Sequence, residues 1–356
     1  MSNFLASENI IIILIILIVS LFVLSKSADV LVGNAVKLSK IWGVPEIIIG
    51  ATIVSLGTTL PELSASVSSA IQGNGNFALG NAVGSIITNT SLIIGIGALY
   101  GKIPVDRRSS QKLTILILAV FLLILPTIPY KISGNTGLIP QWMGFVFIIL
   151  IPVYLFFLIN QEKKVGNKKQ SEHLNEYTNE KENEKETEKE NEKISEKIKG
   201  NVPVIIFQLF LAALVIALSA SGLVGTAQAL AVRIGIPDVI IASTLVAFGT
   251  SVPELSTCIS AAKRKHGGLA IGNIMGANIL NIIMVVGAAT ALTPGGIEVS
   301  QEFYSVNFIA LGIIIAVFGY FAYNSKFDEI SKKEGTFLIA IYMIYLAANI
   351  GLMFIN

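Results

Sequence analysis

The sequence predicts an all-α integral membrane protein with ten transmembrane helices, arranged as two inverted-topology repeats of five helices each. Hydrophobic residues make up 53% of the 356 positions, and several apolar runs approach or exceed the roughly 20 residues that cross a bilayer. Residues 43–95 also align without a gap with residues 235–287, with 22 identities, which indicates an internal duplication. An odd number of helices per repeat places the second copy upside down in the membrane.

The spans follow the hydropathy of each half. Asn9–Leu24 opens the first half, and nothing basic precedes it, as a secretory signal would require. The other predicted spans are Val44–Ala70, Phe77–Tyr100, Leu113–Thr127, Trp142–Leu158, Val202–Leu218, Pro237–Ala262, Leu269–Leu292, Val306–Tyr323 and Thr336–Phe354. We therefore predict a repeat at residues 1–160, a charged linker at residues 161–200 and a second repeat at residues 201–356.

Basic residues set the predicted orientation. The linker carries a four-residue Glu/Lys rhythm without an apolar face, so we expect a soluble spacer. With the N-terminus outside, 23 of the 25 Lys and Arg residues lie in cytoplasmic connections, as the positive-inside rule requires. These connections include Lys26, Lys37, Lys40 and Lys112. Both termini are thus expected outside the cell membrane and the linker in the cytoplasm.

Among the acidic residues, only Glu62 and Glu254 are predicted near the bilayer midplane. Glu46 follows a helix-starting proline at the interface, and Asp29 is expected at the inner end of the first span. A carboxylate at the midplane costs about 2.5–3.5 kcal/mol on insertion scales. Two protonated carboxyls bonded across a bundle would be the structural alternative, but we interpret the pair as a cation site.

The surroundings of each carboxylate supply further oxygens. Thr58 lies four residues before Glu62, as Thr250 does before Glu254, so each hydroxyl is expected beside its own carboxylate. The prolines at 61 and 253 free a backbone carbonyl one turn earlier. Such an oxygen-only site suits calcium better than a soft metal.

A second element follows each motif. It reads Gly-Asn-Ala-Val-Gly-Ser from residue 80 and Gly-Asn-Ile-Met-Gly-Ala from residue 272. Its glycines allow close helix packing. Packing alone, without any role in ion binding, would explain the presence of these glycines. Ser85 and Asn89 lie four residues apart and can add oxygens from the facing side.

The paired hexapeptides Gly-Thr-Thr-Leu-Pro-Glu at residues 57–62 and Gly-Thr-Ser-Val-Pro-Glu at residues 249–254 resemble those of the cation/calcium exchangers, especially the prokaryotic sodium/calcium branch. The resemblance implies an antiporter whose first and sixth helices slide against the other eight. It implies bridging carboxylates at Glu62 and Glu254, flanked by the oxygens of Thr58 and Thr250. The remaining implied positions are backbone carbonyls at Ser55 and Ala247, hydroxyls at Thr59, Ser251 and Ser85, and a central polar residue at Asn89.

Two positions depart from that family pattern. Ala277 stands where the family usually has a second serine, which puts one sodium site in doubt. Asn281 stands where many members have aspartate, which puts potassium co-transport in doubt. The proton-coupled exchangers carry Asn-Ala before the glutamate, and this chain carries Thr-Thr and Thr-Ser.

Other functions fit the sequence less well. A passive cation channel could use the same oxygens, but one asymmetric chain differs from a ring of identical pore loops. Proton-coupled exchange on the same fold also remains an alternative. We see no nucleotide-binding loop, nucleophile constellation or nucleic-acid patch, and expect neither enzyme activity nor a cofactor. Cys258 is expected to be a buried small residue, His266 a loop residue, and the chain a functional monomer.

Overall fold

The computed structural model describes residues 10–105, 107–128, 137–176, 202–233, 247–301, 303–324 and 328–353. Within these ranges, seven helices are long and apolar enough to cross a membrane, and the broken helix over Glu46–Ile71 would make an eighth. Gln111–Thr127 is apolar but shorter. The predicted span Pro237–Ala262 is described only from Ala247 onward. The chain is a multi-pass membrane protein.

The helices of the two halves follow one another in a similar order. The first half contains α2 (Ile10–Trp42), α3 (Glu46–Ile49), η1 (Gly50–Val54), α4 (Ser55–Thr58), α5 (Leu60–Ile71), α6 (Gly75–Thr88), η2 (Asn89–Ile93), α7 (Ile94–Tyr100), α8 (Arg107–Ile124), η3 (Leu125–Thr127) and α9 (Gln141–Glu176). The second half contains α11 (Val202–Arg233), α13 (Ala247–Thr250), α14 (Val252–Lys263), α15 (Gly267–Leu280), η5 (Asn281–Val286), α16 (Gly287–Leu292), η6 (Phe303–Asn307), α17 (Phe308–Asn324) and α18 (Lys332–Met353).

The centre of the bundle is formed by the helices that follow the two carboxylate motifs. Over their most apolar windows, Gly75–Tyr100 is 83% buried and Gly267–Leu292 is 94% buried, against 17% for α2 and for α18. The outer helices expose large apolar side chains, among them Phe22 of α2 and Ile344 of α18. A lipid environment permits apolar side chains on the outer surface of the bundle, because lipid tails are as apolar as the side chains they meet.

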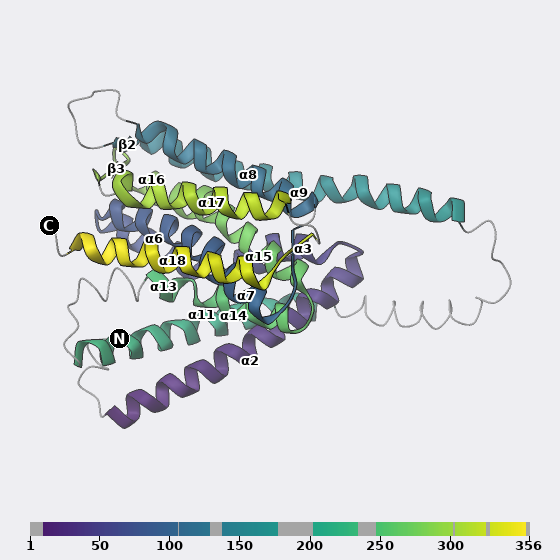
Figure 1. Cartoon of the computed structure of the whole chain (residues 1–356), viewed down its shortest axis with the longest axis horizontal. Helices are drawn as coiled ribbons and strands as arrows, with labels where there is room; N and C mark the ends of the chain where they lie inside the picture. The colour runs from purple at the N-terminus through teal and green to yellow at the C-terminus, as the bar shows by residue number, and fades with distance from the viewer. Residues whose placement is uncertain are drawn as a thin grey trace.

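Two short strand pairs join the halves, which an all-α prediction did not include. β1 (Ile103–Pro104) pairs antiparallel with β4 (Glu329–Ile330), and Lys102 forms a 3.0 Å ion pair with Glu329 beside it. β2 (Gly137–Ile139) pairs antiparallel with β3 (Ile297–Val299) at one end of the bundle (Figure 1). Both pairs connect loops of the first half to loops of the second, so their pairing follows from the packing of the halves.

Two predictions about the basic segments were wrong. The first helix does not end near Leu24 but continues to Trp42, so Lys26, Lys37 and Lys40 lie on a helix and not in a connection. The residues after Leu24 still bury a face, because Ala28, Leu31 and Leu38 are buried. Charged residues on the opposite face do not stop a helix that packs in this way.

Lys112 also differs from prediction. Lys112 belongs to α8 and is fully buried, although we had placed it in a cytoplasmic loop. α8 begins five residues before Lys112, at Arg107. A count of basic residues does not show where a helix begins, so it could not predict that Lys112 is part of one. α9 continues past residue 160 to Glu176, into the first part of the predicted linker. The rest of the linker lies outside the described residues.

Candidate cation-binding site

Each carboxylate motif breaks its helix. α4 ends at Thr58, and Thr59 has φ −83° and ψ −2° before α5 begins at Leu60. The helices on either side of this break are bent by 44°. Proline in the first turn of α5 needs no hydrogen-bond donor there, and Glu62 follows it in that turn. The predicted continuous span is therefore two helices, with the carboxylate at the N-terminus of the second.

The second half repeats this geometry. α13 ends at Thr250, Ser251 has φ −89° and ψ 3°, and α14 begins at Val252 with Glu254 in its first turn. The N-terminus of a helix carries partial positive charge from its unpaired N–H groups. Both helix breaks thus place an acidic side chain where the backbone favours negative charge.

Three π-helical segments lie next to predicted site residues. η1 ends immediately before Ser55, η2 begins at Asn89, and η5 begins at Asn281. η2 packs against α14, the helix of Glu254, and η5 packs against α5, the helix of Glu62. π-helical turns inside α-helices occur frequently at functional sites, because they change the direction of side chains and carbonyls.

The two carboxylates are enclosed together. Glu62 and Glu254 are both 0% exposed, and they interact electrostatically with each other. None of their four side-chain oxygens has a hydrogen-bond partner within the described part of the chain. Burial of an unpaired charge is strongly unfavourable, so this arrangement suits a bound cation.

Five further predicted residues contribute buried polar atoms that find no hydrogen-bond partner among the described residues. These atoms are the Thr59, Ser85 and Ser251 hydroxyls, Oδ1 of Asn89 and both amide atoms of Asn281. A buried polar group without a partner costs about 1–3 kcal/mol. A protein core that holds such a set is a candidate ligand-binding site.

Both threonines that were expected beside their own carboxylates donate instead to an asparagine of the other half. The Thr58 hydroxyl donates to Oδ1 of Asn273 at 3.2 Å, and the Thr250 hydroxyl donates to Oδ1 of Asn81 at 3.0 Å. The reason is the helix break after each threonine, because the i,i+4 relationship holds only along an uninterrupted helix.

Two asparagines that the sequence analysis did not select as site residues connect the halves. Asn81 accepts a 3.0 Å hydrogen bond from Thr250 and donates to the backbone carbonyl of Glu62 at 3.3 Å. Asn273 accepts from Thr58 and donates to Thr257 at 2.8 Å. Their identical position in the two repeated elements, directly after the first glycine, was the signal that could have identified them.

Asn278 is a further residue that sequence reasoning missed. It is fully buried on α15, accepts a 3.0 Å hydrogen bond from Asn89 and donates to the Thr90 hydroxyl at 2.8 Å. Its counterpart in the first repeat is Ile86, so the duplication gave no indication of a polar role. The network orients Asn89 through a residue of the other half.

The remaining predicted positions flank this centre. Ser55 is fully buried at the start of α4, and its hydroxyl donates to the carbonyl of Thr52 at 3.2 Å. Ala247 begins α13. Ala277 is fully buried on α15, one residue beyond Gly276. A β-carbon added to Gly276 would lie 2.6 Å from Cα of Ala51 and 2.7 Å from Oγ of Ser55, so this glycine provides the close helix approach that was expected.

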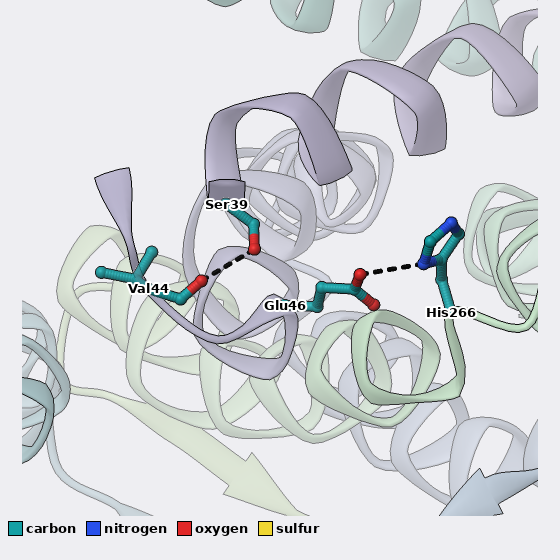
Figure 2. A network of polar contacts seen from close by, with 4 residues as sticks. All are labelled: Ser39, Val44, Glu46 and His266. Atoms are coloured by element: carbon teal, nitrogen blue, oxygen red, sulfur yellow. Dashed lines mark hydrogen bonds and ion pairs between the residues drawn. The ribbon is translucent and has the colours of Figure 1, made fainter. Parts of the chain in front are cut away.

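The first motif helix is also anchored at its start. Glu46 and His266 approach to 2.9 Å between Oε1 and Nδ1, and the hydroxyl of Ser39 donates to the carbonyl of Val44 at 2.7 Å (Figure 2). His266 immediately precedes α15, so it is a loop residue as expected, and its contact with a carboxylate was not expected. Asp29 lies within α2 and contacts Arg264 and Ser260 of the second half. Cys258 is buried, as predicted.

The fold defines a polytopic membrane protein with a pair of buried carboxylates at its core. The family model described as sodium/calcium exchanger protein matches residues 12–160 and 204–351, and the chain belongs to this family. It is a member of a family of cation exchangers that transport ions across membranes. The match comes in two parts, one on either side of the charged linker.

Similar proteins span nearly the whole chain. The sodium/calcium exchanger MaX1 of Methanosarcina acetivorans is 29% identical over 350 residues, covering 93% of this chain and 97% of MaX1. The inner membrane protein YrbG of Escherichia coli is 28% identical over 335 residues, covering 93% and 95%. A structure of the sodium-calcium exchanger NCX_Mj soaked with sodium and without calcium has a TM-score of 0.74 at 25% identity, covering 95% of this chain and 99% of that chain.

Proposed function

We propose that this protein is a secondary active antiporter that exchanges calcium for sodium around a site formed by Glu62 and Glu254. The observation that carries the proposal is the fully buried pair of carboxylates, whose four oxygens have no hydrogen-bond partner within the described residues. Two negative charges match one calcium ion. A calcium site takes 6–8 oxygen ligands in flexible geometry, and the hydroxyl and amide oxygens around the pair can supply the others.

The proposed division of ligands follows charge. Calcium is held mainly by Glu62 and Glu254, together with oxygens of Thr58 and Thr250. Sodium carries a single charge and depends more on neutral ligands, which we assign to Ser85 and to backbone carbonyls of Ser55 and Ala247. Thr59, Ser251, Asn89 and Asn281 complete the proposed set of eleven residues. The names of relatives such as MaX1 support the pairing of sodium with calcium.

We propose the ten-helix topology with two inverted repeats, at residues 1–160 and 201–356, for the whole chain. Both termini then lie outside and the linker at residues 161–200 is cytoplasmic. The protein would function as a monomer in the bilayer. The family model matching each half separately and the constant 192-residue offset of the motifs support this arrangement.

Energetics favour three sodium ions per calcium. Expulsion of calcium against a ten-thousandfold gradient and about 100 mV costs roughly 10 kcal/mol. One sodium ion entering down a tenfold gradient and the same potential releases about 3.7 kcal/mol. Two sodium ions are therefore insufficient, and three suffice.

Calcium flux in proteoliposomes tests this function. We expect rapid calcium movement under an imposed sodium gradient, and only background movement under a pH gradient or without a gradient. Flux driven by the pH gradient would identify a calcium/proton exchanger. Flux that needs no opposing gradient would identify a passive channel, and either result would overturn the proposal.

A further inference from the structure

A cavity of about 680 Å³ lies between α2 and α11, away from the buried carboxylates. Figure 1 shows these two helices side by side at one edge of the bundle. One wall is a single face of α2 with Phe22, Lys26, Val30, Gly33 and Lys37, spaced at the intervals of three and four residues that align side chains on a helix. The opposite wall comes from α11.

The cavity combines an apolar wall with an excess of positive charge. The α11 residues Leu211, Ala212 and Val215 provide most of that apolar wall. The charged lining residues are Lys26, Lys37 and Arg264 against the single acidic residue Asp29. Asp29 is already engaged, because its Oδ1 lies 3.1 Å from Nη2 of Arg264 and accepts a 2.7 Å hydrogen bond from Ser260. The lining therefore has two positive charges in excess.

Two of the cations line the same end of the cavity, near Gly33 and one turn beyond it. Nη1 of Arg264 faces Gly33, where an added β-carbon would lie 3.6 Å away, and Lys37 is one helical turn farther along α2. A guanidinium has five N–H donors, so Arg264 can keep Asp29 and hold a second anion as well. Lys26 lies two turns from Gly33 in the other direction, with its ammonium 5.7 Å from the centre of the Phe22 ring.

We propose that this cavity, the α2/α11 groove, binds an anionic phospholipid. The phosphate would lie between Lys37 and Arg264, and an acyl chain would lie against Val30, Leu211 and Val215. Basic pockets between transmembrane helices are suited to acidic headgroups. The same positive charge makes the groove unsuitable as a route for the transported cations. A small soluble anion would use the cations but leave the apolar wall uncovered.

Native mass spectrometry of the purified full chain in neutral detergent tests the proposal. The probes are phosphatidylglycerol and phosphatidylcholine with the same acyl chains. We expect the protein to retain phosphatidylglycerol several-fold more than phosphatidylcholine. The Lys26→Gln/Lys37→Gln double variant should lose that preference. Lys40→Gln removes the same charge from the same helix, outside the lining of the groove, and should keep the preference.

Three results would overturn the proposal. Equal retention of both lipids by the unaltered protein would show that charge does not select the ligand. An equal loss in Lys40→Gln and in the double variant would indicate general surface attraction. Displacement of the bound lipid by millimolar glycerol phosphate would assign the site to a soluble anion. Failure of glycerol phosphate to compete, together with the loss confined to the double variant, would support the lipid.

Discussion

The hydroxyl of Thr250 donates a 3.0 Å hydrogen bond to Oδ1 of Asn81, a residue 169 positions earlier in the chain. Asn81 in turn donates to the backbone carbonyl of Glu62. In the opposite direction, Thr58 donates to Asn273. Each threonine that precedes a break is thus held by the asparagine of the other half, so neither half can form the carboxylate pair by itself.

Thr250→Val should lower the free energy of unfolding by about 1–3 kcal/mol, because it leaves a buried amide oxygen unpaired. Thermal unfolding in detergent measures the change. Combination with Asn81→Ala in a double-mutant cycle should give a cost smaller than the sum of the two single changes. Thr336→Val is the control, because that exposed hydroxyl donates to a carbonyl one turn earlier on its own helix. Strict additivity would contradict a direct interaction.

Glu254→Gln should abolish the stabilisation of the protein by calcium. A ligand at one hundred times its dissociation constant stabilises the folded state by about 2.7 kcal/mol, and the variant lacks one of the two charges that hold it. Thermal unfolding with and without calcium provides a measurement independent of transport. Glu298→Gln, on the exposed face of β3, should retain the full calcium effect. Normal calcium stabilisation in Glu254→Gln would refute the shared site.

Ala277→Ser should lower the sodium concentration that gives half-maximal calcium exchange by several-fold. Ala277 is fully buried on α15, and its counterpart Ser85 keeps a hydroxyl with no hydrogen-bond partner in the described chain. An added neutral ligand is worth about 1 kcal/mol. The calcium dependence should change little, because two carboxylates dominate calcium binding. An unchanged sodium dependence would mean that this position does not contribute to sodium binding.

Gly276→Ala should destabilise the protein by about 1–3 kcal/mol through overpacking. Its β-carbon would lie 2.6 Å from the backbone of Ala51 in η1, and backbone atoms cannot move aside as a flexible side chain can. Gly312→Ala provides the matched control, because no atom lies within 4 Å of its added β-carbon. Comparable unfolding temperatures for the two variants would show that the contact between α15 and η1 tolerates a wider separation.

The sequence alone predicted the membrane class, most of the apolar helices and the two carboxylate motifs. Hydropathy predicts a helix well where a whole segment faces lipid or protein, as in α17. Hydropathy predicted the end of α2 poorly, because the residues after Leu24 form one buried apolar face and one exposed polar face. It also missed the burial of Lys112, which depends on what packs around α8 and not on the composition of the segment itself.

Residue types and the duplication by themselves determined that Glu62 and Glu254 are equivalent, that each follows a helix-breaking proline, and that hydroxyls surround both. Only the tertiary structure decided which groups meet. Hydrogen bonds such as Thr58 to Asn273 and Asn278 to Thr90 join residues 188 or more positions apart. No local spacing encodes them, because the partner of a buried polar group is chosen by the packing of α15 on α4 and on η2, which exists only once both halves have folded together.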